Sequence, residues 1–188
     1  MNASSTYTSK KRQKSDIDWS AWLTEHGSFL LLFARQQCRS EADAEDVLQE
    51  ALVQLVNAVK SGAFDGDSSK WRSYVCVAIR HLAMDRGRRE QVRKNYEVAQ
   101  QEVMSEGIEE MPWLASSADN DYVRKKVENA LKQLAPDAAE VVVLHMWGGH
   151  TFQQIADMTG TKLSTVTSRY RYSLQHMREY LTTNPIED

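Results

Sequence analysis

The sequence has few of the residues that cross-link small secreted domains or anchor a chain in a membrane. Its 188 residues include two cysteines, Cys38 and Cys76, without a CxxC spacing, so we expect reduced thiols and no zinc site. Apolar runs such as Val141–Leu144 are too short to span a bilayer. The N-terminal stretch MNASSTYTSKKRQKS is polar and basic with no apolar segment behind it. This predicts no secretory signal, no membrane insertion and a cytoplasmic location.

Catalytic and cofactor motifs are also missing. The sequence has no P-loop and no Gly-rich phosphate motif, and its five histidines lack metal-ligand spacing: His26, His81, His145, His150 and His176. We therefore expect a protein that is not an enzyme and that needs no metal and no other cofactor.

Alternating strand patterns of useful length are absent, and helical periodicity takes their place. Apolar residues recur about every four positions between Val47 and Val59, which is typical of one buried helix face. The predicted fold is all-α, with two small helical domains joined by an acidic linker. The expected boundaries are a disordered tail at 1–16, a first domain at 17–92, a linker at 93–120, a second domain at 121–181 and a tail at 182–188.

Charge is distributed in blocks that the net value of −3 conceals. Residues 40–50 hold five acids and no base, residues 80–94 are rich in arginine, and residues 95–121 hold seven acids and no base. A net negative charge argues weakly against nucleic-acid binding, but alternating blocks indicate contact with several different surfaces.

The C-terminal part has the layout of a helix-turn-helix between Thr151 and Met177. Thr151 is placed to cap a short helix and Gly160 to end it. We expect Leu163, Val166, Tyr170, Leu174 and Met177 to line the inner face of the last helix, with Ile155, Leu163 and Val166 as the core between the two helices. The opposite face then displays side chains suited to phosphates and base edges: Lys162, Ser164, Thr165, Thr167, Ser168, Arg169, Arg171 and Tyr172.

Two stretches resemble a known family. The segment with Leu134-Ala135-Pro136, Glu140–Leu144, Gly149–Ala156 and Thr165–Arg169 looks like region 4 of the extracytoplasmic-function (ECF) sigma factors. The stretch SEADAEDVLQEALVQLV is similar to the acidic signature of sigma region 2. The next stretch, FDGDSSKWRSYVCVAIRHLAMDRGRRE, resembles the reader of the promoter −10 element. The resemblance covers about residues 19–90 and 122–181, and it departs from the family at His81 and at Arg171-Tyr172-Ser173.

The resemblance implies a role for each block. Core-polymerase contacts are expected from Asp43, Asp46, Gln49 and Glu50. Contacts with the −10 element are expected from Asp67, Ser68, Ser69, Lys70, Trp71, Tyr74, Arg80, Arg86, Arg88 and Arg89. The exposed face of the last helix would read the −35 element. For Trp71 and Tyr74, burial in the helix core is at least as good an interpretation. For the acidic block, the residues alone favour simple stabilisation of a helix N-terminus, and the polymerase contact is what the resemblance implies.

The predicted function is that of a sigma factor, which directs RNA polymerase core, through its beta and beta-prime subunits, to promoter DNA and assists promoter melting. The expected state on the core enzyme is a monomer, and an anti-sigma partner is left open. The acidic linker would occupy a basic channel of the polymerase or serve as a solvated spacer. The alternative is a stand-alone helix-turn-helix regulator, which would need neither the acidic block nor the arginine-rich helix.

Overall fold

The computed structural model describes residues 18–62, 68–97 and 121–184, and these residues are almost entirely helical. The elements in chain order are α1 (Trp19–Gln37), α2 (Glu41–Ser61), a 3-10 turn η1 (Ser68–Lys70), α3 (Trp71–Glu97), α4 (Asp121–Lys132), α5 (Pro136–Met146), α6 (Phe152–Thr159) and α7 (Leu163–Thr183). The all-α prediction is confirmed. The expected N-terminal tail, most of the acidic linker, Asp67 and residues 185–188 of the expected C-terminal tail lie outside the described residues, while Thr182 and Thr183 of that tail belong to α7.

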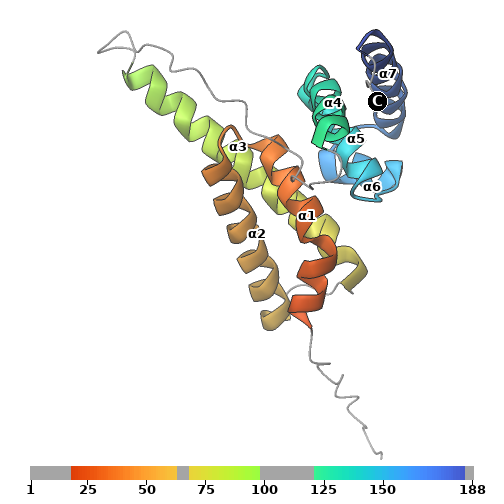
Figure 1. Ribbon diagram of the computed structural model, residues 1–188. Helices are drawn as coiled ribbons and strands as arrows, with labels where there is room; N and C mark the ends of the chain where they lie inside the picture. The colour runs from red at the N-terminus through yellow and green to blue at the C-terminus, as the bar shows by residue number, and fades with distance from the viewer. Residues whose placement is uncertain (1–17, 63–67, 98–120, 185–188) are drawn as a thin grey trace, which may run out of the picture.

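Helices α1, α2 and α3 pack along one another as the N-terminal bundle, and α3 is the longest helix described (Figure 1). The apolar face predicted from Val47 onward points inward, and Val47, Ala51 and Leu55 are completely buried. They meet Leu30 and Phe33 of α1 and Val75 and Ile79 of α3. Burying one such side chain contributes about 1.5–3 kcal/mol, so this core is the main source of stability for the bundle.

Local signals in the sequence explain where the C-terminal helices begin and end. Pro136 occupies the first turn of α5, where its missing N–H is not needed. Thr151 and Gln154 form a capping box at the start of α6, and Gly160 ends that helix with φ +66. The cap at Thr151 and the helix end at Gly160 were predicted, and the structure confirms them.

The C-terminal bundle, α4 to α7, has a core of Leu131, Val142, Leu144, Ile155 and Val166. The predicted inner face of α7 is wrong at two positions, because Leu163 is 44% exposed and Leu174 is 38% exposed. Ser173 is 3% exposed instead. Val166, Tyr170 and Met177 stay on the inner face as predicted, and the small Ser173 is buried in place of its neighbour Leu174.

The two bundles touch. Helices α5 and α6 lie against α1 and α3, and their buried side chains join one continuous core (Figure 1). None of the described helices combines the length and the apolar character that crossing a bilayer requires.

Candidate nucleic-acid interface

The acidic block forms the first turns of α2. Ser40 caps this helix: its hydroxyl oxygen accepts a hydrogen bond from the Asp43 backbone N–H at 3.1 Å. Glu41 pairs with Arg35 of α1, while Glu45, Asp46, Gln49 and Glu50 are exposed. The helix dipole stabilises acids here, but it does not require so many exposed ones.

Arg86 of α3 reaches across to this acidic surface. Its guanidinium lies 3.4 Å from Asp43, 3.4 Å from Asp46 and 3.8 Å from Glu50. The resemblance predicts that Arg86 contacts the −10 element, together with the other arginines of its segment. The structure instead brings it to three of the four residues predicted to bind the core polymerase. A long-range partner on α2 is not visible in the local sequence of α3.

The aromatic residues of the predicted −10 set lie largely inside the bundle. Trp71 is 6% exposed, stacks on Trp19 with ring centroids 4.9 Å apart and meets the edge of Trp22 at 6.0 Å. Tyr74 is half-buried and packs against the core. For both side chains the geometry favours the helix-core interpretation that the sequence left open.

The polar members of that set are more accessible. Ser68, Ser69 and Lys70 form the exposed η1 turn directly before α3. Further along α3, Arg88 is exposed and pairs with Asp85 at 3.2 Å, and Arg89 is also exposed. Exposed cations at this spacing suit a phosphate backbone.

Arg80 has a different environment. Its Nε lies 3.2 Å from a carboxylate oxygen of Glu140, which belongs to α5 in the C-terminal bundle. Burial raises the pKa of Glu140, and the Arg80 guanidinium opposes that rise. Glu140 was not among the predicted site residues, although an acid directly before the apolar run Val141–Leu144 was a signal that could have marked it.

The helix-turn-helix places most of its predicted −35 residues on one side of α7. Lys162, Ser164, Thr167, Arg171 and Tyr172 are exposed, and Tyr172 is the most exposed of them at 63%. Arg171 lies 5.4 Å from the centre of the Tyr172 ring, which holds the two side chains together. The first turns of α7 therefore offer hydroxyl groups, and the following turn offers a cation and an aromatic ring.

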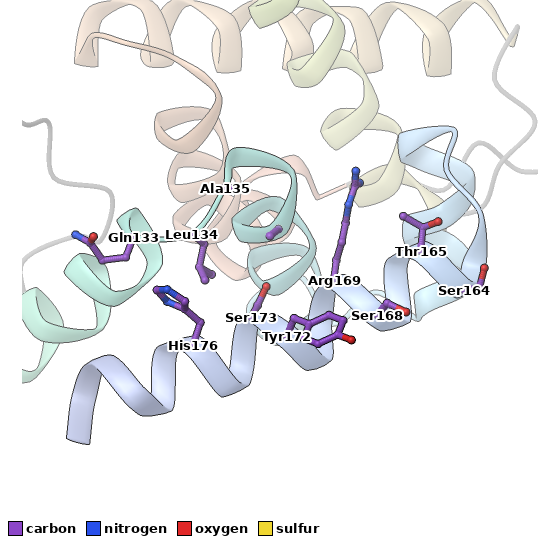
Figure 2. A pocket seen from close by; sticks show the side chains of 11 residues that line it. Gln133, Leu134, Ala135, Ser164, Thr165, Ser168, Arg169, Tyr172, Ser173 and His176 are labelled. Carbon is purple, nitrogen blue, oxygen red and sulfur yellow. The ribbon is translucent and has the colours of Figure 1, made fainter. Parts of the chain in front are cut away.

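A groove of about 610 Å³ runs along this helix between α7 and the α4–α5 connection (Figure 2). Thr165, Ser168 and Arg169 line one side, and Leu134 and Ala135 line the other. Arg169 donates a hydrogen bond to Asp137 of α5 at 2.8 Å. This ion pair is solvent-exposed, so it orients the guanidinium but contributes little to the stability of the fold.

The two cysteines are free thiols, as expected. Burial and the nearby Asp43 carboxylate raise the pKa of Cys38 to about 11, and burial also raises the pKa of Cys76. Both are thus protonated and unreactive at neutral pH. Within the described residues, His, Cys, Asp and Glu side chains do not cluster into a group that could hold a metal ion.

Comparison with known families identifies both bundles. Residues 22–93 match the family described as Sigma-70 region 2, and residues 124–177 match the one described as Sigma-70, region 4. The chain therefore belongs to the sigma-70 family of transcription initiation factors, which are not enzymes. Within that family, the two matched regions and the relatives place the chain among the ECF sigma factors.

Among those relatives is the ECF RNA polymerase sigma factor SigE of Mycolicibacterium smegmatis, 26% identical over 90% of this chain and 63% of that protein. The RNA polymerase sigma-E factor of Streptomyces avermitilis is 26% identical over 91% of this chain and 89% of its own length. The chain thus spans less than two thirds of the first relative and most of the second. The sigma factor RpoE of Bartonella quintana, solved in complex with the anti-sigma factor NepR, is 20% identical. The structural alignment covers 88% of this chain and 97% of the RpoE chain, and its TM-score of 0.61 supports the fold.

Proposed function

We propose that this chain binds RNA polymerase core with its N-terminal bundle, at residues 17–92, and places α7 in the major groove of the −35 element. The observation that carries this is the presence of regions 2 and 4 in one chain, in that order. A stand-alone regulator would need only the second of them. The polymerase supplies the chemistry of RNA synthesis, and this chain selects where it starts.

The core-binding surface in this proposal is the start of α2. Asp43, Asp46, Gln49 and Glu50 face the beta-prime subunit, and further contacts reach the beta subunit. Support comes from the exposure of Asp46, Gln49 and Glu50 and from Arg86, which holds the carboxylates in a fixed arrangement. Preorganised charges favour fast and selective association.

The −10 element would meet the η1 turn and the exposed cations of α3. Separating two DNA strands costs about 1.4 kcal/mol per base step in lost stacking. Lys70, Arg88 and Arg89 can offset part of that cost by binding the backbone of the displaced strand. We include Arg80 in this surface because it lies on the same helix.

The −35 element would meet the N-terminal half of α7 with Ser164, Thr165, Thr167 and Ser168, followed by Arg169 and Arg171. A guanidinium that binds guanine through two hydrogen bonds discriminates against other bases by about 1–3 kcal/mol. Lys162, at the start of the helix, and Tyr172 would contact the adjacent phosphates.

Two further parts of the proposal concern partners and location. The related RpoE was solved with an anti-sigma factor, and this supports an anti-sigma partner here. On the core enzyme the chain would be a monomer, and its place of action would be the cytoplasm, where polymerase and promoters are.

Replacing Glu50 with lysine tests the core-binding surface. Glu50→Lys puts a cation beside Arg86, so the affinity for purified core polymerase should fall at least about 10-fold in a fluorescence anisotropy titration. Glu25→Lys makes the same charge change on exposed α1 and should bind like the wild type. Equal binding by both variants would show that core polymerase does not contact the start of α2.

A further inference from the structure

The contact between the two bundles is built around a buried carboxylate. Glu140 of α5 is 5% exposed and meets Arg80 of α3 at 3.2 Å. From α1, Gln37 donates a hydrogen bond to the same carboxylate at 3.5 Å. A buried charge without its partner is strongly unfavourable, so each side of this contact depends on the other.

The turn between α5 and α6 forms the second part of this contact. His150 is 2% exposed, with its ring nitrogens 3.4 Å from the Ser73 hydroxyl and 4.0 Å from the Cys76 sulfur. Both partners lie on α3. Ser73 is two turns before Arg80, and Cys76 is one turn before it. The His150 ring centroid is 6.1 Å from that of Phe29 on α1.

Two glycines allow this turn to approach so closely. A Cβ on Gly148 would lie 2.8 Å from the Phe29 ring and 2.4 Å from the Leu144 carbonyl oxygen, so a larger residue cannot occupy the position without a shift. Gly149 has φ +62, and a side chain there would face the Arg72 guanidinium at 3.6 Å. The turn is thus shaped to fit the surface of α3.

We propose that the Arg80–Glu140 ion pair and the seat of His150 on α3 form a latch that keeps the free chain closed. In the closed chain the guanidinium of Arg80 is bound by a carboxylate of α5 and is only partly exposed. Promoter DNA must displace Glu140 before a phosphate can take its place. This inference rests on the proposed role of Arg80 in −10 binding.

The charges around the latch agree with this. Burial lowers the pKa of His150 to about 4, with the nearby Arg72 contributing, so the buried ring is neutral at physiological pH. Glu140 is the carboxylate that compensates the positive charge of Arg80, and its removal frees that charge for another anion. A DNA phosphate carries the same charge as a carboxylate and can likewise accept two hydrogen bonds from a guanidinium.

The test uses the full chain, without polymerase, and two variants from opposite sides of the contact. Glu140→Gln removes the carboxylate from α5. Gln37→Glu introduces a second acid beside Glu140 and leaves the C-terminal bundle unchanged. Asp157→Asn is the matched control for the first variant, because it removes one charge from an exposed position of α6, where Asp157 accepts a hydrogen bond from Gln153 of the same helix.

Small-angle X-ray scattering and DNA binding report on separate parts of the proposal. Both latch variants should increase the radius of gyration by roughly a tenth or more over that of the compact chain. Glu140→Gln should also raise the affinity for a fluorescent random-sequence 12-nucleotide single strand about 3- to 10-fold. The control should change neither quantity. Combining Gln37→Glu with Glu140→Gln restores a single carboxylate at the contact and should return the radius toward the wild-type value.

An unchanged radius of gyration in both latch variants would overturn the latch, whether or not the chain supports transcription. An expanded chain with no gain in affinity for the single strand would overturn the masking of Arg80. Failure of the wild-type chain to bind core polymerase would instead refute the proposed function, so the two failures are distinguishable.

Discussion

At the scale of single residues, the arginines of α3 differ in what they contact. Arg86 binds the carboxylates of α2, Arg80 binds Glu140 of α5, and Arg88 pairs with Asp85 on its own helix. In the proposed function, Arg86 would therefore organise the polymerase-binding surface. Arg88 and Arg89, which are exposed further along the helix, would be the cations that meet DNA.

His150 makes a pH prediction at this scale. Its pKa is lowered from 6.5 to about 4 by burial and by Arg72, so the folded state binds the proton less tightly than the unfolded state. The stabilisation that depends on this residue is therefore present above pH 6.5 and is lost as the pH falls toward 4, by at most about 1.4 kcal/mol per pH unit. The groups that face the side chain are Arg72, Ser73 and Cys76 of α3 and Phe29 of α1, and the His145 ring contacts its carbonyl oxygen.

Urea denaturation of the wild type and of His150→Gln at several pH values checks this. Glu140 titrates in both proteins, so the difference between their free energies of unfolding isolates His150. That difference should shrink between pH 6.5 and pH 4. A constant difference across this range would contradict the account.

At the scale of elements, the ends of the helices could be predicted from the local sequence, whereas the faces that pack in the core could be predicted only in part. Thr151, Pro136 and Gly160 mark the helix limits because caps and breakers act on their own backbone. Leu163 is exposed because it sits at the first position of α7, before the helix reaches its neighbours. The partners of Arg86 and Glu140 are 36 or more residues away in the chain, so they could be found only from the fold.

The capping box of α6 carries a stability prediction. The Thr151 hydroxyl accepts a hydrogen bond from the Gln154 N–H at 3.2 Å, and the Thr151 N–H donates to the Gln154 side chain at 2.8 Å. Thr151→Ala should lower the free energy of unfolding by about 1 kcal/mol and the melting temperature by roughly 2–4 °C. Thermal denaturation followed by circular dichroism measures both. Thr182→Ala, near the end of α7, should change little, and an equal loss in the two variants would refute the role of the cap.

At the scale of the whole molecule, the chain carries two binding surfaces on two bundles that are packed together. In the proposed function, these surfaces would be the acidic start of α2 and the cations of α3 in region 2, and α7 in region 4. The all-α fold and the order of the two regions could be predicted from the sequence, because both depend on local patterns. The contact between the bundles could not, because it joins side chains of α1 and α3 to those of α5 and the turn that follows it.

The central claim is that this chain tells RNA polymerase where to start. Transcription of a genomic DNA library by purified core polymerase, with transcript 5′ ends mapped by sequencing, tests it most directly. With the chain present, start sites should gather downstream of a shared pair of −35 and −10 sequences. The double variant Arg169→Ala/Arg171→Ala should lose at least about 10-fold of this output while still binding core polymerase, and Arg178→Ala should not. Start sites that are the same with and without the chain would contradict the account.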